Sequence, residues 1–137
     1  MNDKNKPKKK LTLGIKKKPK ILTLGVNRVW KEFWNNGQIK NERPHKNGKF
    51  HGTVKRWRKN GQLRFEAEYQ NGELNGTLRE WFESGKLKRQ VEYQNDKNHG
   101  IYKAWYDNGQ ISFDGMYNNG KPVGDIKRWN EKGQPIN

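Results

Sequence analysis

Residues 53–76 read TVKRWRKNGQLRFEAEYQNGELNG, and this 24-residue stretch carries the signals of one β-hairpin. Asn60-Gly61 is a favoured short hairpin turn because both of its residues tolerate positive φ. It separates two runs rich in β-branched and aromatic residues, Thr53 to Arg58 and Leu63 to Tyr69. A second turn, from Asn71-Gly72 to Gly76, leads out of the unit. The stretch therefore predicts two antiparallel strands and two turns.

This pattern returns along the chain with a period of 24 residues. The repeating columns are Gly37, Gly61, Gly85, Gly109 and Gly133; Gly52, Gly76, Gly100 and Gly124; and Trp57, Trp81, Trp105 and Trp129, with Phe33 in the first place. Repetition at this scale indicates an array in which each unit buries its surface against its neighbours. Two or more glycines per unit would break a helix before it reached ordinary length. We expect an all-β fold, an elongated antiparallel β-meander with repeats at 29–52, 53–76, 77–100 and 101–124 and a partial repeat at 125–137.

Overall composition by itself would place the chain near the disordered class. Hydrophobic residues make up 29% of the chain and the net charge is +16, so little apolar area is available to offset chain entropy. The aromatic residues, 12% of the total, nevertheless keep fixed intervals past residue 28, which a disordered chain has no physical reason to do. Cysteine is absent, so neither disulfides nor thiolate chemistry enters.

The segment 1–28 differs from the array because it holds ten basic residues and one acidic residue. Pro7 and Pro19 oppose helix, so we expect a lysine-rich tail that is disordered or extended. Such a tail either keeps the protein soluble or serves as an arm that binds polyanions. The candidate polyanion-binding residues are Lys8, Lys9, Lys10, Lys16, Lys17, Lys18 and Lys20. No apolar run of secretory or membrane-spanning length occurs, and we expect a cytoplasmic protein.

The length of the turn at Asn60-Gly61 decides which face carries the tryptophans. A two-residue type I′ turn would place Trp57 on the face opposite Leu63 and Phe65, whereas a three-residue turn with a glycine bulge would place Trp57 beside them in the core. A one-residue change inverts the faces. The two-residue turn is favoured because it pairs opposite charges in three of four repeats: Lys31 with Glu42, Lys55 with Glu66 and Lys103 with Asp114.

Under the favoured register, the tryptophans and a basic column share one exposed face. Such a row is a natural partner surface because Trp and Arg dominate interface hot spots. We expect neighbouring cations to cover the rings, Arg64 over Trp57 and Lys88 over Trp81. The predicted partner-binding residues are Trp57, Trp81, Trp105, Trp129, Lys55, Arg79, Lys103 and Lys127.

We find no pattern of residues typical of an enzyme. His51 and His99 occupy one repeat column in a turn, and His45 stands apart, so metal-ligand spacing is absent. Glu66 and Glu68 resemble a carboxylate pair, but cross-strand pairing with lysine explains Glu66 without catalysis. We therefore expect a non-enzymatic protein with no catalytic residues, no metal and no cofactor.

The repeat resembles the variant MORN repeat found in bacterial proteins often labelled antitoxin components. The strings that carry the resemblance are WFESGKLKRQVEYQNDKNHG at 81–100 and WYDNGQISFDGMYNNGKPVG at 105–124. The match extends over residues 29–137, with Asp96 in place of a turn glycine and Pro44 and His45 in place of Glu-x-Tyr. The resemblance implies an elongated, curved β-sheet that serves protein or lipid interactions, and an antitoxin-like role.

Three kinds of partner are compatible with these features. The first is a protein gripped by the repeat face, with the tail aiding contact with an anionic partner. The second is RNA or DNA, bound by the tail and by aromatic residues interleaved with basic columns, although acidic neighbours would neutralise those columns. The third, less favoured, is an anionic membrane surface.

Overall fold

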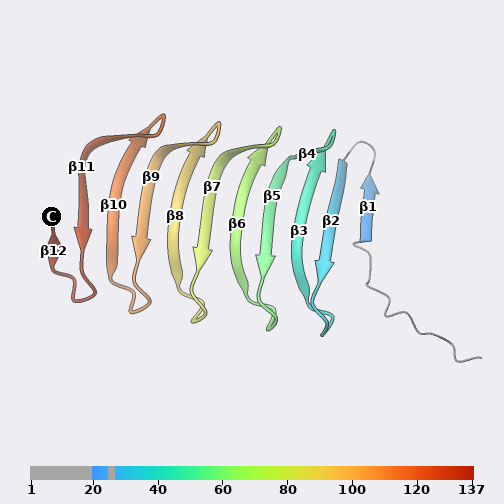
Figure 1. Ribbon diagram of the computed structural model, residues 1–137, viewed down its shortest axis with the longest axis horizontal. Coiled ribbons are helices and arrows are strands. Elements are labelled where there is room, and N and C mark those ends of the chain that lie inside the picture. The colour runs from blue at the N-terminus through green and yellow to red at the C-terminus, as the bar shows by residue number, and fades with distance from the viewer. Residues whose placement is uncertain (1–19, 25–26) are drawn as a thin grey trace, which may run out of the picture.

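The computed structural model describes residues 20–24 and 27–137, which form one antiparallel β-sheet that does not close on itself (Figure 1). The strands follow one another in chain order from β1 to β12, with β4 beside β3. Their bounds are β1 Lys20–Leu24, β2 Asn27–Phe33, β3 Ile39–Lys46, β4 Lys49–Phe50, β5 Gly52–Trp57, β6 Leu63–Gln70, β7 Glu73–Trp81, β8 Leu87–Gln94, β9 Lys97–Trp105, β10 Ile111–Asn118, β11 Lys121–Trp129 and β12 Pro135–Ile136. The described residues contain no helix, and the predicted β-meander is confirmed.

The sheet begins earlier in the chain than the repeat pattern does. Strand β1 lies antiparallel to β2, with Leu22 opposite Val29. The end of the segment 1–28 thus adds one strand to the sheet. Residues 1–19, which hold most of the predicted tail, lie outside the described residues.

The upper turns in Figure 1 are the two-residue turns of the array. Both residues have positive φ at Asn47-Gly48, Asn71-Gly72, Asn95-Asp96 and Asn119-Gly120. Positive φ at both positions is the signature of a type I′ turn. Asp96 takes the place of glycine at φ 65° and accepts a hydrogen bond at Oδ1 from the Leu74 amide, 2.7 Å away. This bond to the preceding repeat compensates for an unfavourable backbone conformation.

The lower turns in Figure 1 are longer than the predicted type I′ turn. The Arg58 amide donates to the Gln62 carbonyl at 2.8 Å, and the Gly61 amide donates to the Arg58 carbonyl at 3.0 Å. Gly61 has φ +85°, whereas Asn60 is not among the residues with positive φ. Lys59-Asn60-Gly61 is therefore a three-residue loop with glycine in the left-handed position. The prediction of a two-residue turn here is wrong, and the alternative three-residue turn is correct.

A second irregularity restores the charge pairing beyond this loop. Trp57 lies opposite Leu63, but the register shifts by one residue before Arg56, which lies opposite Phe65. As a result Lys55 faces Glu66, and the equivalent pairs Lys31–Glu42 and Lys103–Asp114 form as predicted. Directly opposed residues share a face and alternate residues of a strand share a face. Trp57 and Leu63 therefore lie with the charged pairs, and Phe65 lies on the other side, a combination that neither predicted register contained.

The two faces of the sheet have different contents. We call the side with Trp57, Trp81 and Trp105 the tryptophan face, and the opposite side the core face. The core face holds the described hydrophobic side chains that are fully enclosed, Val54, Ala67, Leu78 and Val91, exposed by at most 6%. These four are consecutive cross-strand neighbours, each directly opposite the next.

The described residues supply no second layer over this central row, so longer side chains of the same face enclose it. Phe65 lies two residues before Ala67 and Tyr69 two residues after it, on the same side of β6. The tyrosine ring contacts the Phe50 ring, with centroids 5.2 Å apart. Small aliphatic residues in the middle, flanked by long ones, allow a single sheet to bury apolar area.

Hydrogen bonds tie each hairpin to the next at both ends of the strands. At the lower turns, the Trp34 Nε1, an Arg58 guanidinium nitrogen and the Tyr106 hydroxyl donate to carbonyls 23 residues ahead, those of Trp57, Trp81 and Trp129, at 2.9–3.2 Å. At the upper turns, the amides of Gly72, Asp96 and Gly120 donate to carbonyls 22 residues back, those of Phe50, Leu74 and Asn98, at 2.8–3.0 Å. The array is therefore held together by turn contacts as well as by the sheet.

Two glycines, Gly76 and Gly100 of the column that begins at Gly52, leave room for a carboxylate. Gly100 has φ +106°, and a Cβ built there would lie 2.0 Å from Glu92 Oε2. The same oxygen accepts a hydrogen bond from the Ile101 amide at 2.8 Å. Gly76 and Glu68 repeat the arrangement, also at 2.0 Å. Glycine is required here because the carboxylate occupies the space of a side chain.

Gly100→Ala is expected to destabilise the protein more than Gly109→Ala. Both substitutions place alanine at positive φ, a strain of about 1–2 kcal/mol. Only Gly100→Ala also displaces a carboxylate, since nothing lies within 4 Å of a Cβ at Gly109. We expect a further loss of about 1–3 kcal/mol in the free energy of unfolding, measured by urea denaturation. Equal losses in the two variants would contradict the proposed role of Glu92.

Candidate functional site

The predicted partner-binding residues all belong to the tryptophan face. In each of four strands, the basic residue stands two positions before the tryptophan, so both point to the same side. These pairs are Lys55 and Trp57, Arg79 and Trp81, Lys103 and Trp105, and Lys127 and Trp129. The register thus brings together all eight residues that the sequence singled out.

An apolar strip crosses this face just above the lower turns. In each of four hairpins, an aromatic residue is opposed by an aliphatic one: Phe33 by Ile39, Trp57 by Leu63, Trp81 by Leu87, and Trp105 by Ile111. The tryptophans are half-buried, and Phe33 is 40% exposed. We call this row the apolar strip. The favoured sequence register missed its aliphatic half, because it contained no bulge between Leu63 and Phe65.

A ladder of charges runs parallel to the apolar strip. Successive strands contribute Lys31, Glu42, Lys55, Glu66, Arg79, Gln90, Lys103, Asp114 and Lys127, each opposite the next. Lys31 Nζ lies 3.0 Å from Glu42 Oε2, and Arg79 Nη1 lies 3.0 Å from Glu66 Oε1. Partly exposed ion pairs of this kind contribute little stability. The ladder holds five cations and three carboxylates, so its net charge is small.

Arg64 and Lys88, which the sequence predicted to cover tryptophan rings, lie beside other groups. Lys88 Nζ lies 5.7 Å from the centroid of the Phe82 ring, rather than over Trp81. Arg64 lines a hollow with Trp34 and Arg58 and does not lie over the Trp57 ring. Because the bulge next to Phe65 reverses the alternation, Arg64 and Lys88 turn toward the core face. The predicted covering of Trp57 and Trp81 is therefore wrong.

The titratable groups with shifted pKa values behave as structural groups. A hydrogen bond from Asn41, and then the nearby charge of Arg43, lower the pKa of Glu32. Burial alone would lower the pKa of Arg89, but its hydrogen bond and charge interaction with Glu80 outweigh burial and raise it. Burial raises the pKa of Tyr93. All three shifts move away from neutral pH, whereas acid–base catalysis calls for a pKa near the working pH.

The histidines have local roles. His51 Nδ1 and His99 Nδ1 each lie 3.4 Å from a turn amide of the next hairpin, those of Asn71 and Asn119. His45 contacts the Phe50 ring, with centroids 4.7 Å apart. Within residues 20–24 and 27–137, no group of three or more His, Cys, Asp or Glu residues could hold a metal ion. The same residues contain no helix that is long and apolar enough to cross a membrane.

Only one of the predicted polyanion-binding lysines falls within the described residues. Lys20 lies in β1, opposite Lys31 of β2. Lys8, Lys9, Lys10, Lys16, Lys17 and Lys18 lie outside the described residues.

Comparison with known proteins identifies the repeat. A family described as MORN repeat variant matches residues 29–47, 50–71, 74–95 and 98–119. Three of these matches extend from one upper turn to the next, so each corresponds to two strands and the lower turn between them. No curated protein matches the chain. MORN repeats are commonly modules of protein or membrane interaction. Because the four matches together span more than half of the chain, the chain belongs to the MORN repeat variant family.

Proposed function

We propose that this protein is a non-enzymatic interaction protein that binds a protein partner through its tryptophan face. The observation that carries this proposal is the apolar strip, a continuous row of half-buried aromatic and aliphatic side chains. No other described element covers this row. A protein partner with a matching apolar surface would exclude water from it, and buried tryptophans are among the strongest interface anchors.

The charge ladder favours protein over nucleic acid as the ligand of this face. Glu42, Glu66 and Asp114 lie between the basic residues, so a phosphate backbone laid along the ladder would meet carboxylates as well as cations. A protein surface can alternate its own charges to match. The ladder would then set the register of the partner, and the apolar strip would supply most of the affinity.

We propose a wider role that is compatible with the family. A scaffold or antitoxin-like role in the cytoplasm fits a binding module, and the lysine-rich tail would add attraction to an anionic partner. The alternative is that RNA or DNA is the main ligand, held by the tail. The anionic surface of a membrane is a less favoured target of the same lysines.

A photo-crosslinking amino acid at Leu87 is expected to capture one protein species in cells. The matched control places the same group at Phe65, on the core face of the neighbouring hairpin, two strands away. We expect the Leu87 product, identified by mass spectrometry, to be enriched over the Phe65 product and to resist nuclease. Capture of nucleic acid alone, or equal capture from both positions, would count against the tryptophan face.

Trp81→Ala is expected to weaken binding of that partner by about 2 kcal/mol or more, the loss typical of a hot-spot residue. Because Trp81 is only half-buried, its loss should cost less stability than the roughly 3–5 kcal/mol of a fully enclosed aromatic residue. Titration calorimetry and thermal melting measure the two effects. A collapsed fold would show that the ring is structural, and unchanged affinity in a folded variant would exclude Trp81 as a binding residue.

The tail hypothesis is tested by the salt dependence of RNA binding. Each phosphate contact contributes roughly −0.7 to the log–log slope of affinity against salt for single strands. Replacing Lys8, Lys9, Lys10, Lys16, Lys17, Lys18 and Lys20 by glutamine should flatten that slope in a filter-binding assay. A slope that stays the same would assign the contacts to other parts of the chain.

A further inference from the structure

The contacts between cations and aromatic rings do not lie on the tryptophan face. Within the described residues, two of them, Arg56 over Phe65 at 4.8 Å and Arg128 over Phe113 at 5.6 Å, join opposed residues of the core face. The other three lie at the lower end of the strands. Lys40 and Lys59 lie 4.6 and 5.5 Å from the Trp34 ring, and Lys88 lies 5.7 Å from the Phe82 ring.

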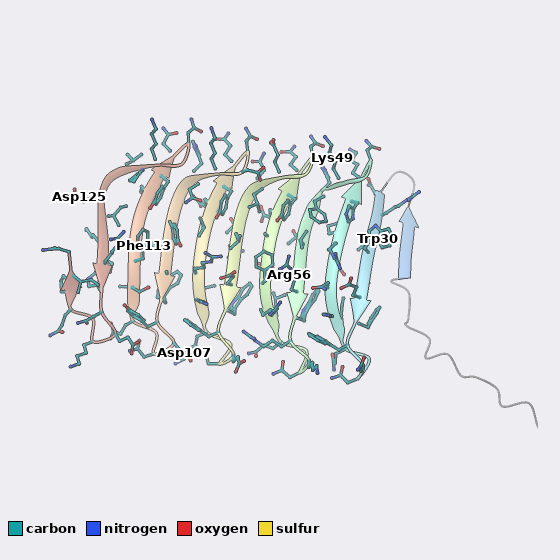
Figure 2. The ribbon with its side chains drawn as sticks, viewed as in Figure 1. Trp30, Lys49, Arg56, Asp107, Phe113 and Asp125 are labelled. Carbon is teal, nitrogen blue, oxygen red and sulfur yellow. The ribbon has the colours of Figure 1, made fainter. Side chains whose placement is uncertain are left out.

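Alternation along the strand places these lower contacts on the core-face side. Trp34 directly follows Phe33, and Phe82 directly follows Trp81, so their side chains turn away from the apolar strip. Figure 2 shows the side chains at this end of the strands, where Asp107 is labelled, and at the opposite end, where Lys49 is labelled. The two ends of the strands therefore form separate surfaces.

A groove runs along this lower part of the core face. Its first section has a volume of about 500 Å³ and is lined by Trp34, Arg58, Lys59, Asn60, Arg64 and Glu83. A second section of about 220 Å³ shares Arg58 and Arg64 with the first. Its other lining residues are Arg56, Phe65, Glu80, Trp81 and Lys88. We call the two sections together the lower groove. It extends across three hairpins, from the first lower turn to β8.

The lower groove has an excess of positive charge. Three cations and one carboxylate line its first section, and Lys40 and Lys88 add two more cations beside the rings. The second section adds Arg56 and one carboxylate, Glu80, which is paired with Arg89. The carboxylate, Glu83, is 90% exposed and lies 3.8 Å from Arg58 Nη1, so solvent screens this pair. The charge ladder on the tryptophan face, by contrast, holds its carboxylates between its cations.

Two groups of the groove are held in place by hydrogen bonds. Trp34 Nε1 donates to the Trp57 carbonyl at 3.2 Å, and Arg58 Nη2 donates to the Trp81 carbonyl at 3.0 Å. A fixed ring and a fixed guanidinium lose little freedom when a ligand binds, which favours affinity. Within residues 27–137, the side chains of Lys40, Arg64 and Lys88 make no hydrogen bond or ion pair, so a ligand would break none to reach their charges.

We propose that the lower groove binds single-stranded nucleic acid. Phosphates would lie against Lys40, Lys59, Arg64 and Lys88, and a base would stack on the Trp34 ring in place of a lysine that now lies over it. Surfaces for single strands combine these two elements, a positively charged groove and aromatic side chains on which bases stack. An acidic peptide would meet the same cations but has no base to place on the ring. Because this groove and the apolar strip are on opposite faces, the proposal stands apart from partner binding.

The test compares two triple variants of the full chain that lose the same charge. One is Lys40→Gln, Arg64→Gln and Lys88→Gln in the groove; the matched control is Lys49→Gln, Lys97→Gln and Lys121→Gln at the upper turns. Both keep the tail. The probes are fluorescein-labelled twelve-nucleotide oligo(U) and oligo(dT), which separate RNA from DNA, with anisotropy as the readout. We expect the groove variant alone to flatten the log–log salt slope by about 2 and to weaken low-salt binding by about tenfold or more.

Trp34 supplies a second test that leaves the charge unchanged. Trp34→Leu should weaken oligonucleotide binding by about tenfold with the salt slope preserved, and Trp34→Phe should restore most of the affinity, because any aromatic ring can stack. Thermal melting checks that the variants fold. Equal losses in the two triple variants, or an equal loss of binding to a labelled polyglutamate peptide in the groove variant, would overturn the proposal.

Discussion

One register shift in each hairpin determines which side chains share a face of the sheet, and therefore which surfaces the protein offers to ligands. The three-residue loop at Lys59-Asn60-Gly61 sets Trp57 opposite Leu63, and the bulge next to Phe65 then sets Lys55 opposite Glu66. Without the bulge, the charged residues of one strand would face the aromatic residues of the other. With it, the apolar strip and the charge ladder share one face, and the enclosed aliphatic row lies on the other.

Repetition makes this arrangement stable in a sheet with no second layer among the described residues. The two central hairpins bury their aliphatic residues against each other, as Ala67 of one does against Leu78 of the next. Turn-to-turn hydrogen bonds add a further tie between hairpins. At the lower turns, the donor of this hydrogen bond differs between repeats: it is an indole at Trp34 and a guanidinium at Arg58. The acceptor is a backbone carbonyl, which every repeat provides. The sequence of that column can therefore vary while the array remains intact.

The two faces offer different chemistry to ligands. The tryptophan face combines apolar surface with nearly balanced charge, which suits another protein. The lower groove combines fixed aromatic and basic groups with little opposing charge, which suits a polyanion. A single chain of this family could therefore hold two ligands at once, because a sheet one layer thick leaves both of its faces available.

The sequence by itself determined the fold class, the period and the charge pairs. Glycine and tryptophan columns at 24-residue intervals are local signals, and opposite charges such as Lys31 and Glu42 indicate their own partners. The sequence also selected the eight residues that the structure gathers on the tryptophan face. It could not determine the turn at Asn60-Gly61, because that dipeptide suits either of two turns. The hydrophobic pattern could not decide between them, since both faces carry apolar residues. The position of the bulge was decided by tertiary structure, because each hairpin must match the spacing of both neighbours. The bulge turns Leu63 toward Trp57 and Arg64 away from it.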